Sequence, residues 1–167
     1  MTNKYIDNSK FFSEMVEWKS EYTKSQELGE KPPPVNNYIG ECFWKIAENL
    51  SHKSNFLNYP FRDDMIGDAI ENCIMYAHNF NPDKSKNPFS YFTQITYYAF
   101  IRRIQKEKKQ SYIKFKLVEE MDSEGKIRNY MSDNYDTEDK SKSEKIAEYF
   151  SLSKNDIENF DKTKKKK

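Results

Sequence analysis

The chain has 167 residues, of which 36% are hydrophobic and 33% charged, and its formal net charge is +1 at pH 7. This balance excludes a uniformly basic nucleic-acid-binding protein, so charge must be judged segment by segment. The aromatic share of 16% argues against disorder along the whole chain, and no apolar run is long enough to span a bilayer. The N-terminal sequence is polar and does not resemble a signal peptide, so we expect a cytoplasmic protein.

Two helices are expected in the first third of the chain. The first covers about residues 10–24, with Asn8 or Ser9 as its N-cap, and it ends before Gly29 and a run of three prolines. The second covers about residues 38–53, where apolar residues recur at spacings of three and four.

A third helix is predicted over residues 61–79, and Asn81-Pro82 ends it. Its apolar residues form one stripe: Met65, Ile66, Ala69, Ile70, Cys73, Ile74 and Ala77. A fourth helix is expected to begin at Asn87-Pro88 and to reach about Lys109. Residues 112–120 fit either a short strand or an extension of that helix.

Beyond Met121 the composition becomes acidic, and residues 133–143 have the composition of a disordered segment. A weak amphipathic helix is expected over residues 143–150, before a terminal run of lysines. Cys42 and Cys73 fall on apolar stripes, so we interpret them as buried, reduced thiols.

The third helix carries a cluster of acidic residues opposite its apolar stripe. At 100° per residue, Asp64, Asp68 and Glu71 fall together, with Met75 among them. One interpretation is an ordinary solvated face. The other is a docking surface for a basic protein partner, because no lysine interrupts the cluster.

The fourth helix has two distinct sides. The side assigned to the core holds Phe89, Thr93, Thr96, Phe100 and Ile104. The opposite side holds Tyr91, Tyr98, Arg102, Gln105 and Lys109. Single-stranded bases stack on aromatic rings, and arginine and lysine neutralise phosphates, so this side is a candidate for nucleic-acid binding.

A basic segment extends that candidate surface. Seven bases lie between Arg102 and Lys116, with Glu107 as the only acid among them. A helix C-terminus favours a few positive charges because of its dipole, but seven bases exceed that need.

Signals for catalysis are weak. His52 and His78 are the only histidines, and neither has a partner at a spacing typical of metal ligands. The sequence contains neither a glycine-rich phosphate loop nor a nucleophile elbow. We therefore expect no enzymatic activity, no metal and no cofactor.

Three spaced blocks resemble the second conserved region of bacterial sigma factors of the sigma-70 family. They are Asp64-Met65-Ile66-Gly67-Asp68-Ala69, Phe80-Asn81-Pro82-Asp83-Lys84 and Phe89-Ser90-Tyr91-Phe92. Further matching segments resemble the late-transcription sigma factors of T-even-type bacteriophages: Ile46-Ala47-Glu48, Asn55-Phe56, His78-Asn79-Phe80, Lys86-Asn87-Pro88, Thr93-Gln94 and Arg103-Ile104. The resemblance covers about residues 5–116.

This resemblance implies an all-α fold. Residues 1–116 would form a compact four-helix domain like sigma region 2. Residues 117–167 would form an acidic, partly disordered, flexible tail. The implied function is to direct phage late transcription in the cytoplasm of the infected bacterium, by binding host core RNA polymerase and melting an AT-rich promoter element.

The resemblance also assigns residues to the two surfaces. Docking on the clamp helices of the largest polymerase subunit falls to Asp64, Gly67, Asp68, Ile70, Glu71 and Ile74. Transfer of the family pattern puts the melting aromatics at Phe92, Ile95 and Thr96, although two tryptophan positions of the family hold Ile95 and Thr96 here. The helix wheel favours Tyr91 and Tyr98 instead. The expected DNA-binding residues are Tyr91, Phe92, Ile95, Tyr98, Arg102, Arg103, Lys106 and Lys109.

Members of the phage family also bind the DNA sliding clamp through a short C-terminal peptide, and they work with a late co-activator. The nearest match here has Leu152, Ile157 and Phe160 as its apolar anchors. Two other interpretations stay open on the sequence. One is a helical module that binds single-stranded nucleic acid without polymerase, and the other is a scaffold protein whose two surfaces both contact proteins.

Overall fold

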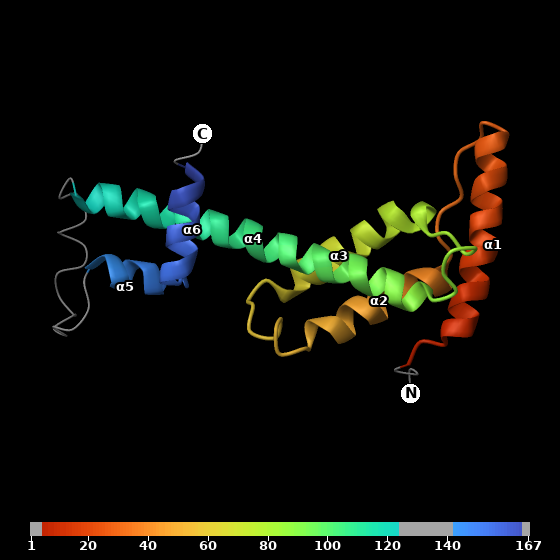
Figure 1. The fold of residues 1–167 in the computed structure, drawn as a ribbon, viewed down its shortest axis with the longest axis horizontal. Coiled ribbons are helices and arrows are strands. Elements are labelled where there is room, and N and C mark those ends of the chain that lie inside the picture. The colour runs from red at the N-terminus through yellow and green to blue at the C-terminus, as the bar shows by residue number, and fades with distance from the viewer. Residues whose placement is uncertain (1–4, 124–141, 165–167) are drawn as a thin grey trace. The chain divides into compact units, whose positions relative to one another are not determined.

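The computed structural model describes residues 5–123 and 142–164, and all regular secondary structure in these stretches is helical (Figure 1). The elements are α1 (Asn8–Glu27), α2 (Asn37–Ser51), α3 (Arg62–Tyr76), the 3₁₀ turn η1 (Ala77–Asn79), α4 (Pro88–Ser123), α5 (Lys142–Tyr149) and α6 (Lys154–Lys164). The predicted all-α class is confirmed. Among these residues, no helix combines the length and apolar character needed to cross a membrane.

The chain divides into two compact units, an N-terminal unit (Met1–Arg103) and a C-terminal unit (Ile104–Lys167). The boundary falls within α4, earlier than the expected division at residue 116. Its physical reason is that Tyr112 and Phe115 on α4 form a core with residues of α5 and α6. Most of the segment expected to be disordered, 133–143, lies outside the described residues.

The first two helices are started by side-chain caps. Asp7, not Asn8 or Ser9, caps α1, because its carboxylate accepts hydrogen bonds from the amides of Ser9 and Lys10. The Asn36 side chain accepts from the amide of Ile39 and so caps α2.

A glycine and a tryptophan define the course of the linker after α1. Gly29 has a φ of +67°, a left-handed conformation that glycine adopts without strain. The indole of Trp18 donates to the carbonyls of Pro33 and Pro34, 3.3 and 3.1 Å away, which ties the proline run to α1.

Within the N-terminal unit, α2 and α3 pack closely, and α1 lies across the ends of α2 and α4 (Figure 1). The core is rich in aromatic rings, and its largest fully buried members include Phe11, Phe43, Phe80 and Phe92. The rings of Phe43 and Phe92 are 4.5 Å apart at their centroids. Such contacts add about 0.5–1.5 kcal/mol beyond the burial of apolar area.

The junction of α2 and α3 is fixed by Arg62. Its guanidinium donates to the Ser51 hydroxyl at 2.9 Å and to the Glu48 carboxylate at 2.8 Å. The imidazole of His52 lies 3.1 Å from the same guanidinium. These contacts stabilise the start of α3, which has no side-chain cap of its own.

The start of α4 agrees with the expectation from sequence. The Asn87 side chain accepts from the amide of Ser90 at 3.1 Å, and Pro88 is the first helical residue. The helix continues to Ser123 rather than ending near Lys109, so residues 112–120 extend the helix and form no strand.

The C-terminal unit has a small core of its own. Tyr112, Phe115, Ala147 and Leu152 are buried, with Ile146, Phe150, Ile157 and Phe160 packed around them. The predicted helix over residues 143–150 corresponds to α5, whereas α6 was not predicted.

Candidate nucleic-acid interface and docking surface

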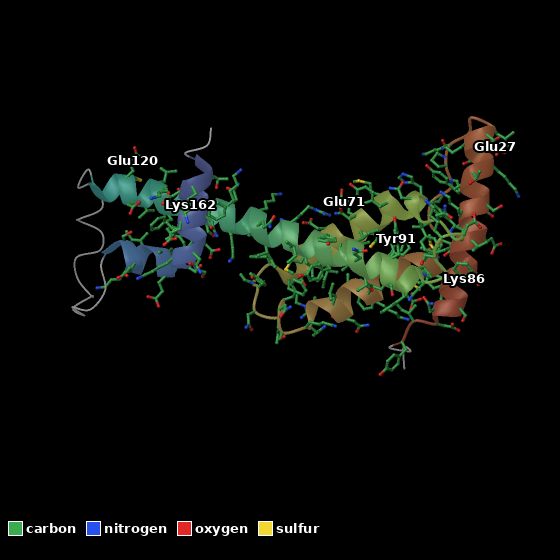
Figure 2. The ribbon with its side chains drawn as sticks, viewed as in Figure 1. Glu27, Glu71, Lys86, Tyr91, Glu120 and Lys162 are labelled. Carbon is green, nitrogen blue, oxygen red and sulfur yellow. The ribbon has the colours of Figure 1, made fainter. Side chains whose placement is uncertain are left out.

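The outer side of α3 presents most of the residues assigned to polymerase docking. Asp64, Gly67 and Glu71 are exposed, and Ile74 has 47% of its surface exposed although the apolar stripe predicted burial. Glu71 lies at the edge of this unit, away from the crowded side chains between the helices (Figure 2). Ile70 is half-buried.

Nothing in the surroundings of Gly67 within this chain explains why the position holds glycine. A Cβ built on it would meet no atom within 4 Å, and its φ is not in the left-handed region. The fold therefore does not require glycine there, although glycine costs a helix interior about 1 kcal/mol relative to alanine.

Asp68 is bound to a residue that the sequence assigned to the other surface. Its carboxylate oxygens accept from Arg103 Nε at 2.6 Å and from Arg103 Nη2 at 2.7 Å. The pair is largely covered, with 16% of the arginine side chain and 32% of the aspartate side chain exposed. Asp68 as a docking residue and Arg103 as a DNA-binding residue stay predictions, and in this conformation the two side chains bind each other.

The expected stacking residue Phe92 lies in the core of the N-terminal unit. Its ring is fully buried against Phe11, Phe43 and Phe80, so no base can stack on it while this core is intact. The wheel of α4 placed Thr96, Phe100 and Ile104 in the core correctly, but it also placed Phe89 there, which is 42% exposed, and it missed Phe92.

Tyr91 and Ile95 are half-buried and pack against the same core. Tyr91 lies among the side chains between the helices (Figure 2), with its ring centroid 5.4 Å from that of Phe80. Burial raises the pKa of the Tyr91 hydroxyl, with a smaller contribution from Cys73. Each residue is therefore only partly available for contact with a base.

Tyr98 and Arg102 are the exposed members of the expected DNA-binding set in the N-terminal unit. Tyr98 has 52% of its surface exposed, and Arg102 donates to the side-chain oxygen of Asn72 at 2.8 Å. That hydrogen bond uses one guanidinium nitrogen and orients the group, leaving further donors for a phosphate or a base edge.

A groove beside Tyr98 was not anticipated from the sequence. It has a volume of about 650 Å³, within the usual range for ligand sites. Its lining comprises Leu50, Lys53, Asn55, Phe56, Phe89, Ser90, Thr93, Gln94, Tyr97 and Tyr98. The sequence signal was the pair Tyr97-Tyr98, of which only the second was selected by the wheel. Exposed rings, two amides and a lysine together suit an unstacked nucleobase and its phosphate.

The remaining expected DNA-binding residues, Lys106 and Lys109, belong to the C-terminal unit and are exposed there. Of the three expected clamp anchors, Leu152 is buried, and Ile157 and Phe160 are half-buried and pack on the same small core. A partner could bury the whole of these three side chains only if that core opened.

No protein-family model matches this sequence, and no curated protein is significantly similar to it. Assignment of a function therefore rests on the residues and their geometry.

Cys42 and Cys73 are buried free thiols, as the sequence predicted. Burial raises the pKa of each to about 11, so both are protonated at neutral pH. Within residues 5–123 and 142–164, no group of three or more histidine, cysteine or acidic side chains could hold a metal ion.

Proposed function

We propose that this protein is a sigma-type initiation factor that directs late transcription of a bacteriophage in the cytoplasm of the infected bacterium. It binds core RNA polymerase through the outer side of α3 and an AT-rich promoter element through α4 and the groove beside Tyr98. Residues up to the C-terminal unit form a domain like sigma region 2. The factor acts without catalysis of its own and needs no cofactor.

The observation that carries the proposal is the chemistry of two exposed surfaces within one sequence pattern. The residues that resemble the sigma docking motif include an exposed acidic and apolar surface made by Asp64, Glu71 and Ile74. The residues that resemble the promoter-melting motif run into exposed tyrosines and Arg102. An acidic surface fits a basic protein partner, and an aromatic-basic surface fits single-stranded DNA.

Melting would be favoured at A·T steps, because unpairing costs least there. In the proposed complex, Tyr97 and Tyr98 offer rings to unpaired bases. Arg102, Lys106 and Lys109 neutralise phosphates, which makes the interaction dependent on salt.

The deciding experiment is transcription in vitro with purified bacterial core polymerase on supercoiled DNA carrying an AT-rich octamer near the start site, with the transcript start mapped by primer extension. A discrete start that requires the protein is the expected result. Asp64→Lys/Glu71→Lys should abolish that transcript and polymerase binding. The matched control Asp83→Lys changes an exposed acid on the η1–α4 loop and should behave as wild type. Unchanged polymerase binding by the double variant would contradict the docking assignment.

A second candidate function is binding of single-stranded nucleic acid without polymerase. The groove beside Tyr98 favours it, since its aromatic, amide and lysine lining is independent of α3. Tight binding of an oligonucleotide with no affinity for polymerase would select this function.

A further inference from the structure

The part of α4 in the C-terminal unit is strongly basic. Residues 104–116 contain five lysines and a single acid, Glu107: the lysines are Lys106, Lys108, Lys109, Lys114 and Lys116. Lys106, Lys109 and Lys114 are exposed. Lys108 and Lys116 differ from these three, because acidic residues of the same unit hold their ammonium groups.

Two of these acids lie on α6. The Lys108 ammonium donates to both carboxylate oxygens of Asp156, at 2.8 and 3.1 Å. The Lys116 ammonium lies 3.0 Å from Glu119 Oε2 and 3.7 Å from Asp161 Oδ1. Between them, the Tyr112 hydroxyl donates to Asp161. Asp156 near the start of α6 therefore contacts Lys108, and Asp161 further along α6 contacts Tyr112 and Lys116.

Packing holds α6 in this position. The Tyr112 and Phe160 rings stack with centroids 5.0 Å apart, and Leu152 is buried beside them. Asp156 also accepts from the amide of Ser153, which fixes its carboxylate at the start of α6. Burial alone would raise the pKa of Asp156, but hydrogen bonds from Lys108 and Ser153 lower it below its ordinary value.

This docking is marginal in strength. An isolated helix of 11 residues is short of the length that is stable in water, so α6 depends on its contacts with α4. Partly exposed ion pairs contribute little each, and the core beneath α6 is small. The phosphates of DNA can bind the same lysines, and the release of counterions from the DNA favours that binding.

We propose that α6 is an intramolecular competitor of DNA. Asp156 occupies Lys108 in the free protein, whereas Asp161 only lies beside Lys116, whose ammonium is hydrogen-bonded to Glu119 of α4 itself. Displacement of α6 therefore adds Lys108 to the DNA-binding surface. The inference rests on the proposed function, because it assumes that this part of α4 contacts DNA. It adds that α6 weakens this contact in the free protein.

The test uses the full-length protein and a fluorescein-labelled DNA duplex carrying the AT-rich element, with binding measured by anisotropy between 50 and 300 mM salt. Asp156→Asn/Asp161→Asn removes the two charges with little change of shape, and asparagine still accepts from Ser153. We expect affinity to rise on the order of tenfold at 0.1 M salt. The salt slope should steepen by about one, since the released Lys108 makes one additional phosphate contact and each such contact contributes about 0.9.

The matched control is Glu144→Gln/Glu158→Gln. It removes the same number of charges from α5 and α6, but these acids pair with Lys154 and Lys162, outside the basic segment. Its salt slope should stay that of wild type. An equal gain in the two double variants would attribute the effect to net charge and overturn the inference.

Lys108→Gln provides a second test, in which the same substitution is compared in two backgrounds. In the wild-type background it should change DNA affinity little, because Asp156 already holds that lysine. In the Asp156→Asn/Asp161→Asn background it should reduce affinity by about fivefold and lower the slope by about one. Equal effects in both backgrounds would show that Lys108 was never withheld from DNA.

Failure of the proposed function gives a different pattern. If the double variant binds DNA more tightly but polymerase-dependent transcription is absent, the sigma role fails and the competition stands. If wild type binds DNA and the double variant binds identically, the competition fails and the sigma role stands. Absence of DNA binding by every variant at 50 mM salt would overturn both.

Discussion

Asp68 on α3 and Arg103 on α4 form a two-pronged ion pair, with Arg103 Nε 2.6 Å from Asp68 Oδ2 and Nη2 2.7 Å from Oδ1. Planar, paired hydrogen bonds of this kind are the strongest that arginine makes with a carboxylate. Because both side chains are largely covered, the pair fixes the packing of α3 against α4 before any partner is present.

The first prediction concerns this pair. Asp68→Asn should lower the free energy of unfolding by about 1–3 kcal/mol, because it removes the negative charge from a largely covered ion pair. Urea unfolding of Asp68→Asn, Arg103→Gln and the double variant measures the coupling. Additive losses would show that the two residues do not stabilise each other.

The second prediction separates docking from folding at Gly67. Gly67→Ala should stabilise α3 by about 0.5–1 kcal/mol, since alanine suits a helix better and its Cβ meets no neighbour. Under the proposed function, the added methyl should weaken polymerase binding if the partner approaches the backbone closely. Thermal unfolding and polymerase binding, measured together, distinguish the two effects. Tighter binding by the alanine variant would contradict a close approach at this position.

The third prediction contrasts two aromatic residues of α4. Tyr98→Ala should leave stability within about 0.5 kcal/mol of wild type, because Tyr98 is exposed, but should weaken single-stranded DNA binding by about 1–3 kcal/mol. Phe92→Ala should instead destabilise the fold by about 3–5 kcal/mol, because it empties a filled core position. Normal DNA binding by Tyr98→Ala would remove Tyr98 from the proposed interface.

The fourth prediction concerns the thiols. With a pKa of about 11, Cys42 and Cys73 are uncharged at pH 8 and enclosed by the core, so an aromatic disulfide reagent should react with them only as the chain unfolds. In denaturant both should react within the mixing time. Rapid reaction of either thiol in the native protein would place it at the surface.

The fifth prediction is a loss of stability of the C-terminal unit in acid. The folded pKa of Asp156 lies below its ordinary value of 3.8, so its ion pair stabilises the unit fully above that pH. That contribution disappears as the pH falls through the folded pKa. The protection of the α6 amides from hydrogen exchange, relative to the unfolded chain at the same pH, should therefore fall below about pH 4 in wild type, and less so in Asp156→Asn. An identical pH profile for the two proteins would contradict the role of the carboxylate.

Sequence periodicity located the first four helices but only part of the buried side of α4, because it found Thr96, Phe100 and Ile104 and missed Phe92. Six aromatic residues in the first half of α4 lie on all sides of the helix, so a wheel alone has no single apolar centre. The buried side is set by Cys73 on α3, whose sulfur lies 3.9 Å from the Phe92 carbonyl and 3.6 Å from the Thr96 hydroxyl. That contact is tertiary and has no local signal.

The same reason explains why α6 was missed. Its sequence is mostly polar, and only Ile157 and Phe160 mark an apolar side, so local pattern gives little support for a helix. The stabilising contacts come from Tyr112 and Phe115, more than thirty residues earlier in the chain. The groove beside Tyr98 likewise needs the loop after α2 to meet α4.

The positions of the two tryptophans give the protein an optical asymmetry. Trp18 is buried and Trp44 is half exposed, and both lie in the N-terminal unit. Indole emission therefore does not report unfolding of α5 and α6. A collisional quencher should reduce the emission of Trp44 more than that of Trp18. Fluorescence and far-ultraviolet circular dichroism would consequently follow different transitions if the two units unfold separately, and a gap between the two curves would measure how far the C-terminal unit is independent.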